Sequence, residues 1–132
     1  MEFIFTTDLP EKEELYNLYD HLGWNGFLKL SSEQLLKTMK NSYYSVYVYC
    51  KDDLIGTGRI VSDGIINAYL CGVGVRSEYR NNGVATKIIG MLVEYCQENN
   101  LHIQFFCEPH LVPFYNKMDF EKFAIGMRLK ES

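Results

Sequence analysis

The sequence predicts an α/β (α+β) domain with a mixed, mostly antiparallel sheet, helices on both faces and a parallel strand pair at its centre. Three runs rich in β-branched and aromatic residues, at 42–50, 53–62 and 64–75, are separated by the hairpin signals "KDD" and "DG". They favour an antiparallel meander. An amphipathic helix over 84–96 then leads to a buried run at 102–107, which should return parallel to the strand before the helix.

Two helices are predicted before the meander, after a short strand over "EFIF". In the first, over 8–24, Asp8 can cap the N-terminus and Pro10 suits the first turn, while apolar residues recur at helical spacing. The second follows in "SSEQLLKTMK", where Ser31 or Ser32 can cap and the apolar residues form a narrow stripe.

The end of the chain predicts three further elements. Asn99 and Asn100 can end the central helix in a left-handed turn before the strand over 102–107. A short helix over 111–118 and a final strand over 120–130 complete the pattern. The sequence shows no internal repeat or linker, so we expect one domain over residues 1–132.

Composition and charge exclude several classes of partner. With 47% hydrophobic residues the chain is globular in type, and its net charge of -4 argues against a nucleic acid or an anionic membrane surface as the main partner. The first residues have neither a basic start nor a long apolar run, which indicates no signal peptide and no membrane span. We therefore expect a cytoplasmic protein.

The four cysteines form no metal or redox motif. They are scattered through apolar runs without a Cys-x-x-Cys pair, so we expect reduced cysteines in the core and no metal site. Cys107 is expected in the core as well, because it lies in an apolar strand pattern and has no identifiable base nearby. The cysteines are Cys50, Cys71, Cys96 and Cys107.

The stretch "VRSEYRNNGVAT", residues 75–86, has the features of an anion-binding turn between a strand and a helix. The first backbone N–H groups of a helix have no intrahelical partner, and the helix dipole favours negative charge there. Gly83 lets a phosphate approach the backbone, Arg80 adds a cation, and Asn81 and Asn82 tolerate unusual turn angles. The Walker and dinucleotide patterns both fail, for lack of a Gly-Lys-Ser/Thr and of a third glycine. A loop-shaping glycine beside a solvated arginine is the alternative.

Two segments of the chain resemble the GNAT superfamily of N-acetyltransferases. "VRSEYRNNGVATKIIGMLVEYC" is similar to its acetyl-coenzyme A signature, Q/R-x-x-G-x-G/A, with Arg80 to Ala85 as the core and Ser77 in place of the usual proline. "VPFYNKMDFEKF" resembles the family's "FYEKLGF" segment, with Asp119 in place of glycine. The substitution predicts a left-handed backbone at Asp119, which aspartate tolerates better than most residues.

The resemblance implies where acetyl-CoA binds. Its pantetheine arm would pair with Val73, Gly74 and Val75 on the strand before the loop, where the two parallel strands splay apart. The glycines of "CGVGV" suit a bulge or a close backbone approach there, or a simple sheet kink. Its pyrophosphate would lie on the loop and helix start, beside Arg80, on backbone groups of Asn81, Asn82, Gly83, Val84, Ala85 and Thr86.

The resemblance also implies a general acid. Tyr115 matches the position where many members have a tyrosine near the cofactor sulfur, and a phenol can protonate a departing thiolate. A core tyrosine on a short helix is the alternative. A backbone N–H near Val75 is the implied donor to the thioester carbonyl.

The general base has three candidates. Glu108 follows the strand over 102–107 and can take a proton directly or through water, but it can equally cap the next helix. His110 has a suitable intrinsic pKa and can instead be a solvated loop residue. Water alone is the third candidate.

The sequence offers few candidates for the acceptor site. Trp24, Arg59 and Asp63 can contact a substrate, although a packed helix end and a hairpin turn explain them equally well. We expect direct acetyl transfer to a primary amine of a small molecule or a peptide, by a monomer or a homodimer. A non-catalytic acyl-CoA-binding or sensor module is the alternative.

Overall fold

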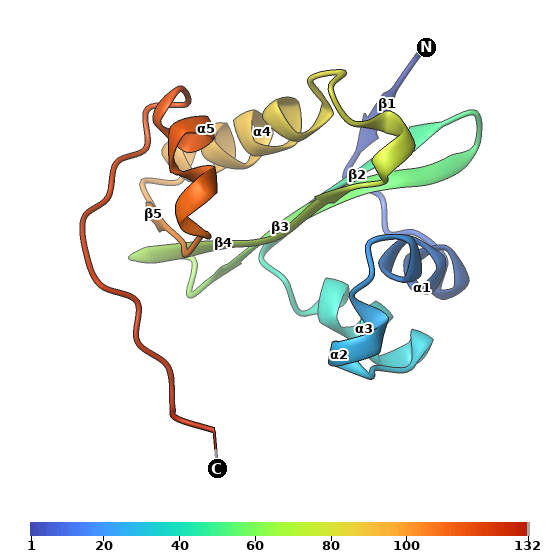
Figure 1. The fold of residues 1–132 in the computed structure, drawn as a ribbon, viewed down its shortest axis with the longest axis horizontal. Helices are drawn as coiled ribbons and strands as arrows, with labels where there is room; N and C mark the ends of the chain where they lie inside the picture. The colour runs from blue at the N-terminus through green and yellow to red at the C-terminus, as the bar shows by residue number, and fades with distance from the viewer. Residues whose placement is uncertain (132) are drawn as a thin grey trace.

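The computed structural model describes residues 1–131, which form a five-stranded sheet with helices on both faces (Figure 1). β4 and β5 pair parallel and the other neighbours pair antiparallel, which confirms the predicted mixed sheet. The parallel pair was expected at the centre of the sheet, but it lies at one edge, because no strand within residues 1–131 adds beyond β5. The strands follow chain order across the sheet: β1 (Ile4–Thr6), β2 (Tyr44–Cys50), β3 (Asp53–Ser62), β4 (Asn67–Val75) and β5 (His102–Gln104).

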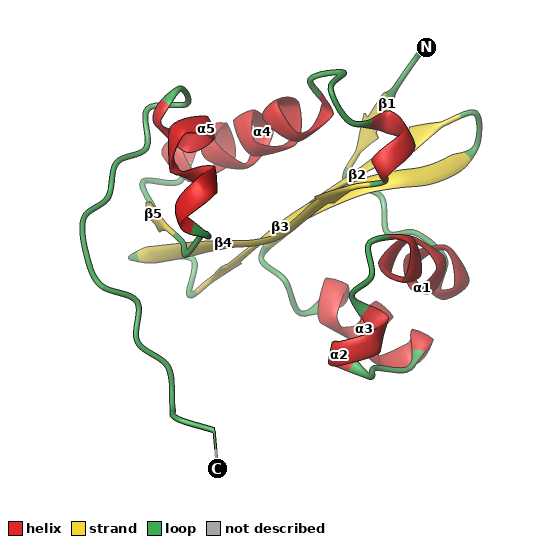
Figure 2. Ribbon diagram, viewed as in Figure 1, coloured by secondary structure: helices red, strands yellow, loops and turns green. Residues whose placement is uncertain are grey.

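The helices form two layers, one on each face of the sheet (Figure 2). One face carries α4 (Val84–Glu98) and α5 (Val112–Asn116). The other carries α1 (Lys12–His21), α2 (Asn25–Leu28) and α3 (Ser32–Lys40). Two 3₁₀ turns, η1 (Ser77–Tyr79) and η2 (Pro109–Leu111), precede α4 and α5.

Positive φ angles at the turns explain why the meander forms where the sequence places it. Lys51 (φ 50°) and Asp52 (φ 70°) close the β2–β3 hairpin in the left-handed conformation that two-residue hairpin turns require. Gly64 (φ 80°) follows β3, and Asn100 (φ 56°) follows α4. The hairpin predictions and the left-handed turn after the central helix are therefore confirmed.

The helices before the meander differ from the prediction at their starts. α1 begins at Lys12, and its N-cap is Glu11, which makes no side-chain capping bond. The predicted cap Asp8 lies outside the helix, because its N–H donates to Thr6 Oγ1 in a turn after β1. In α3, by contrast, Ser31 caps Gln34 in a reciprocal capping box. The short helix α2 has no counterpart in the sequence prediction.

Two hydrophobic clusters flank the sheet. One lies between α4 and strands β2 to β4, and it includes the buried helix residues Val84, Ile88, Ile89, Leu92 and Cys96. The second lies beneath α1 and α3 and includes Leu15, Leu18, Leu35, Met39 and Tyr47. Because α4 is packed on four strands, β2 to β5, the position of its N-terminus relative to β4 is determined by the core.

The last part of the chain corrects three predictions. β5 ends at Gln104, so the strand predicted to Cys107 is shorter by three residues, and Cys107 is exposed instead of lying in the core. Residues 120–130 contain no strand and 121–131 are exposed along their length. β5 stops where β4 bends away from it after three residue pairs, and within residues 1–131 no strand pairs with the tail or with the outer edge of β5.

We predict opposite stability effects for two glycine substitutions. A Cβ at Gly58 would lie 2.6 Å from Cγ2 of Ile88, so Gly58→Ala should lower the free energy of unfolding by about 1–3 kcal/mol. A Cβ at Gly90, exposed on α4, would meet no atom within 4 Å, so Gly90→Ala should raise it by about 0.5–1 kcal/mol. Urea denaturation with unchanged m-value measures both. Equal shifts of the same sign would contradict the packing of α4 on β3.

Candidate active site

The parallel strands β4 and β5 separate soon after they meet. Their register covers only 67–69 against 102–104. We call the diverging residues, 70–75 of β4 and 105–108 after β5, the splay. The β3–β4 register shifts opposite Gly72 (φ 63°), where β4 carries one extra residue. This bulge bends β4 where it leaves β5.

The bulge and the strand end determine which backbone groups face the splay. Arg76 N–H donates to Ile55 on β3, and successive N–H groups of a strand point in opposite directions. The N–H groups of Val75 and, by the same alternation, Val73 therefore point toward the splay. The Val75 carbonyl accepts from Arg80 Nε at 3.1 Å. This edge can pair with an extended ligand.

The loop from β4 to α4 presents the helix N-terminus to the same place. Gly83 (φ 75°) is the N-cap and makes no side-chain cap, and Asn81 is left-handed as well (φ 66°). The first intrahelical donor is Lys87, which bonds to the Gly83 carbonyl, so three earlier N–H groups, those of residues 84–86, lack a helical partner. A Cβ at Gly83 would meet nothing within 4 Å, so the loop is open to a phosphate there.

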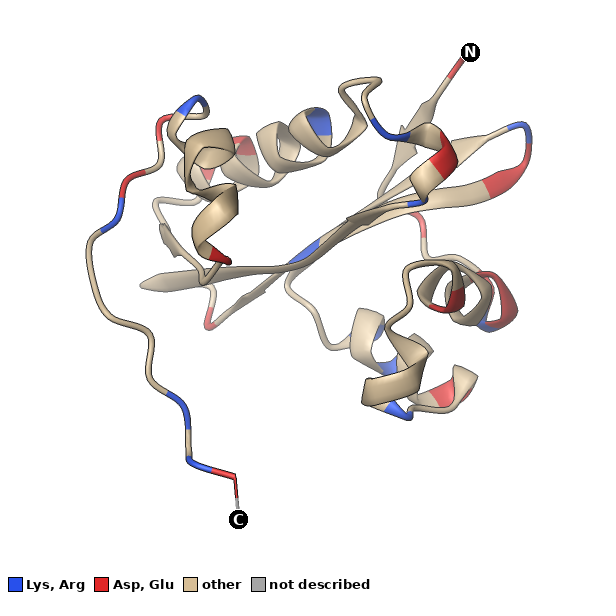
Figure 3. Cartoon of the chain, viewed as in Figure 1, with Lys and Arg blue, Asp and Glu red and all other residues tan. Residues whose placement is uncertain are grey.

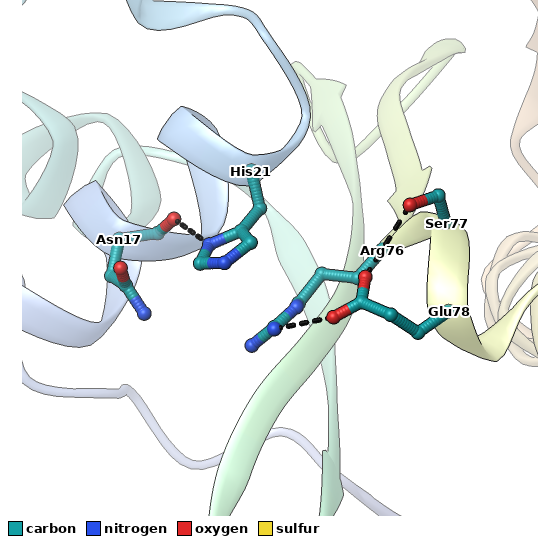
Figure 4. A network of polar contacts seen from close by, with 5 residues as sticks. All are labelled: Asn17, His21, Arg76, Ser77 and Glu78. Atoms are coloured by element: carbon teal, nitrogen blue, oxygen red, sulfur yellow. Dashed lines mark hydrogen bonds and ion pairs between the residues drawn. The ribbon is translucent and has the colours of Figure 1, made fainter.

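Polar side chains hold the loop in this shape. Asn82 donates to the carbonyls of Tyr79 and Arg80, at 3.0 and 3.1 Å. Arg76 pairs with Glu78 at 2.6 Å and extends toward α1, where His21 Nδ1 lies 2.9 Å from the Asn17 carbonyl (Figure 4). A hydrogen bond from its own backbone and the Arg76 guanidinium hold the pKa of Glu78 below its ordinary value. His21 is therefore engaged with its own helix.

Tyr115 lies in an aromatic cluster beside the splay. Its ring centroid is 4.5 Å from that of Phe105 and 5.1 Å from that of Phe114, and Phe120 is the third neighbour. Burial raises the pKa of its phenol, and the nearby Cys107 adds to the rise. The left-handed backbone expected at Asp119 is confirmed, with φ 67°. It ends the turn that returns Phe120 to this cluster.

The candidate bases are exposed. Glu108 is the N-cap of η2 but makes no side-chain cap, so the capping role considered for its carboxylate is not observed. His110 lies two residues further on, within η2. Neither side chain has a hydrogen-bonding or ionic partner among residues 1–131.

Of the three predicted acceptor residues, two lie on the same face of the sheet and the third lies in a hairpin turn. Trp24 packs edge-on against Tyr19 at 5.1 Å and covers Gly74, whose Cβ would be 2.8 Å from its ring. Arg59 lies on the same face and donates to Ser42 Oγ at 3.3 Å. The Asp63 carboxylate accepts from two N–H groups of its own hairpin turn, at 2.8 Å each, and these bonds lower its pKa. Asp63 therefore lies away from the other two.

The surroundings of Arg59 include two polar residues that the sequence analysis did not place beside it. Tyr19 and Cys71 lie beside it; burial raises the pKa of each, and the guanidinium opposes the rise. Within the described part of the chain no carboxylate lies within 4 Å of Arg59, and its buried Nε has no partner. What places Cys71 beside Arg59 is the β3–β4 register, which pairs the two residues and is known only from the fold.

Residues 1–131 contain no group of three or more His, Cys, Asp or Glu residues that could hold a metal ion. The described helices are too short or too polar to cross a membrane.

A mixed sheet whose parallel pair splays beside a helix N-terminus, with a tyrosine-bearing helix opposite, defines an acyltransferase of the GNAT class. The family model described as an acetyltransferase (GNAT) domain matches residues 11–128. The chain therefore belongs to the GNAT family of acetyltransferases.

Relatives and solved structures agree with this assignment. An uncharacterized N-acetyltransferase, ycf52, of Pyropia yezoensis is 28% identical over 120 residues, which are 87% of this chain and 67% of the relative. The "probable acetyltransferase" SA2161 of meticillin-resistant Staphylococcus aureus has the same fold, with a TM-score of 0.83 at 22% identity over 98% of this chain and 100% of that one. AAC(6')-Iy, solved with a CoA-containing bisubstrate analog, has a TM-score of 0.76 at 14% identity, over 100% of this chain and 99% of that one.

This membership identifies the chain as an acetyl-CoA-dependent N-acetyltransferase. The residues at the splay fit such a donor. The unpaired edge of β4 matches an extended amide arm, and the open N-terminus of α4 matches a pyrophosphate.

We predict that the Tyr115 phenol ionises above the ordinary tyrosine value of about pH 10, because burial disfavours the phenolate. The unfolded chain loses this proton first, so the stability linked to the group is complete below pH 10 and falls as the pH rises through the folded-state pKa. A ¹³Cζ tyrosine NMR titration, assigned with Tyr115→Phe, measures it. A midpoint at or below that of free tyrosine would show that the phenol is not buried in this way.

Proposed function

We propose that residues 1–132 form one domain that moves the acetyl group from acetyl-CoA directly to a primary amine of a small molecule or a peptide. One observation carries the proposal: the splay brings the open N-terminus of α4, the free edge of β4 and the Tyr115 cluster to one region. Direct transfer is favoured because no nucleophile is activated there. Cys107 is exposed, and its thiol makes no hydrogen bond within residues 1–131.

The loop and the edge of β4 hold the donor in this proposal. The pyrophosphate lies on the N–H groups of Gly83 and the first residues of α4, with Arg80 adding positive charge beside them. The pantetheine amides pair with the N–H and carbonyl groups that point away from β3. The residues concerned are Val73, Gly74, Val75, Arg80, Asn81, Asn82, Gly83, Val84, Ala85 and Thr86.

Acetyl-CoA supplies a thioester, whose carbon–sulfur bond breaks as the carbon–nitrogen bond to the amine forms. The Val75 N–H, which points into the splay, donates to the carbonyl oxygen as negative charge develops on it. Tyr115 gives its phenolic proton to the departing sulfur. A tyrosine phenol is protonated at neutral pH, and burial raises the pKa of this one further, so it is available as an acid and not as a base.

A base must remove the proton that the amine carries. Glu108 fits this role because its carboxylate is exposed at the end of the splay and makes no capping bond. His110, or water alone, is the other source. The proton returns to Tyr115 through solvent, which restores the acid for the next cycle.

Trp24 and Arg59 form the acceptor side of the site in this proposal. Both lie on the sheet face opposite α4, and Trp24 covers Gly74 on the strand that pairs with the donor. Trp24 offers an aromatic surface to an alkyl ammonium group. Arg59, which has no carboxylate partner within residues 1–131, offers its guanidinium to a polar group of the acceptor.

We predict that acetyl-CoA raises the melting temperature, because a ligand that binds only the folded state stabilises it by about 2.7 kcal/mol at one hundred times its Kd. NAD and ATP at the same concentrations should leave it unchanged, since the loop lacks both of their binding patterns. Differential scanning fluorimetry measures this. No shift at saturating acetyl-CoA would refute the donor site. A shift without release of free thiol in a broad amine screen would instead indicate a non-catalytic binding module.

We predict that Tyr115→Phe lowers kcat by about 10²-fold or more, because the departing sulfur loses its proton donor. The Kd for acetyl-CoA should change little, since the ring and its aromatic contacts remain. Thiol release and calorimetric titration measure the two quantities. Tyr16→Phe, at an exposed tyrosine of α1, is the control and should keep wild-type kcat. An unchanged kcat in Tyr115→Phe would remove Tyr115 from the reaction.

A further inference from the structure

Arg59 carries its charge in a part of the fold that has almost no others. The five strands contain one Lys or Arg, which is Arg59, and one Asp or Glu, which is Asp53 at the start of β3 (Figure 3). All other Lys, Arg, Asp and Glu residues among 1–131 lie outside the strands. A cation on a sheet beneath a layer of helices loses part of its hydration, and an opposite charge or hydrogen bonds must offset that loss.

The side chain of Arg59 lies on the face of the sheet that carries α1 and α3. Gly58, the preceding residue of β3, faces α4, because a Cβ there would lie 2.6 Å from Ile88 Cγ2. Successive side chains of a strand point to opposite faces. Tyr19 of α1 and Ser42, which follows α3, lie beside the guanidinium. Arg59 is therefore half-buried between the sheet and these helices.

No carboxylate of the described chain neutralises the charge of Arg59. None lies within 4 Å of it among residues 1–131, and its buried Nε has no hydrogen-bonding partner there. Burial raises the pKa of the Tyr19 phenol and of the Cys71 thiol, so both neighbours are uncharged at neutral pH. The guanidinium thus has donors left for a second group, and its paired N–H groups match the oxygens of a carboxylate or a phosphate.

Arg59 reaches the splay at the bulge of β4. A Cβ at Gly72 would lie 3.4 Å from Nε, 3.7 Å from Cγ and 3.8 Å from Cδ of Arg59, so the side chain crosses the strand at this glycine. Trp24 covers Gly74, two residues further along β4. Two residues of a strand span at most about 7 Å. One small molecule can therefore contact the guanidinium and the indole together, beside the donor site.

A second polar atom on this face of β3 is buried without a partner. Thr57 is 1% exposed, and its Oγ1 makes no hydrogen bond within residues 1–131. Thr57 pairs with Gly74 in the β3–β4 register and shares its face of the strand with Arg59, two residues later. Unsatisfied buried polar atoms are few in a native fold, and two of them beside the residues that Trp24 covers favour a binding site over ordinary packing.

We propose that the acceptor is a small primary amine that also carries an anionic group, a carboxylate or a phosphate, and that Arg59 binds this group. The inference rests on the proposed function, because it names the molecule that receives the acetyl group. The anion lies on the guanidinium over Gly72, and the amine extends past Trp24 toward the Val75 N–H, where the thioester carbonyl is held. Arg59 therefore determines specificity and takes no part in the chemical step.

Matched pairs of amines test this specificity. Thiol release at saturating acetyl-CoA gives kcat and KM for β-alanine against β-alaninamide and for phosphoethanolamine against ethanolamine. The wild type should use the anionic member with a kcat/KM at least about tenfold higher, because it alone makes a charge-assisted hydrogen bond to Arg59. The pair with the larger preference distinguishes a carboxylate from a phosphate. Equal use of both members in both pairs would overturn the proposal.

Variants of Arg59 separate recognition from structure. Arg59→Gln should raise KM for the anionic amine about tenfold or more, with little change in kcat and in the values for the neutral amine. Arg59→Lys keeps the charge but lacks the paired N–H groups, so it should keep part of the preference. Arg128→Gln removes an exposed arginine and should behave as the wild type. Equal losses for both members of a pair in Arg59→Gln would show that Arg59 only supports the fold.

Binding without turnover separates this inference from the proposed function. In the presence of coenzyme A, the ¹H–¹⁵N signal of Arg59 Nε, assigned by its loss in Arg59→Lys, should shift saturably with β-alanine or phosphoethanolamine and stay in place with their neutral counterparts. A shift without thiol release from any amine would keep the anion site and refute the proposed transfer. No shift with either anionic amine overturns the anion site, whether or not thiol is released.

Discussion

The short parallel pairing of β4 with β5 is the constraint on which the rest of the site depends. Three residue pairs join the strands, and the bulge opposite Gly72 then turns β4 away from β5. A longer ladder would satisfy the backbone groups of Val73 and Val75 within the sheet. Because it stops early, those groups stay available, and Arg80 occupies only the Val75 carbonyl. The structure therefore leaves backbone hydrogen-bonding capacity free beside the loop that leads to α4.

The packing of α4 on the sheet fixes the distance between the edge of β4 and the loop that precedes the helix. The helix buries five residues against β2, β3 and β4, and the glycines of β3 at positions 56 and 58 let it approach closely. Its N-terminus cannot shift along the sheet without breaking those contacts. The left-handed turn at Gly83 then directs the unpaired N–H groups toward the end of β4. Core packing on one side of the sheet thus positions polar groups at its edge.

Local signals in the sequence were sufficient for the elements that local physics determines. The hairpins follow from turn residues that accept positive φ, and α4 follows from an apolar period that matches a buried face. The left-handed Asp119 followed from the family motif in the same way. The incorrect predictions concern features that depend on contact with a second element of the fold. Asp8 is held by a turn after β1, so it cannot cap α1. The strand predicted over 120–130 has the correct alternation, but alternation cannot supply a partner. The environment of Arg59 depends on cross-strand register, which no single run of residues encodes.

The outer edge of β5 and the acid candidate are physically connected. Phe105 directly follows β5, Phe120 directly precedes the tail, and both rings pack on Tyr115. The phenol is therefore held between the two segments that lack strand partners within residues 1–131. Burial among these rings raises its pKa, and the nearby Cys107 adds to the rise. The ionisation of Tyr115 therefore depends on how the residues that follow β5 and α5 pack around the phenol, and not on α5 alone.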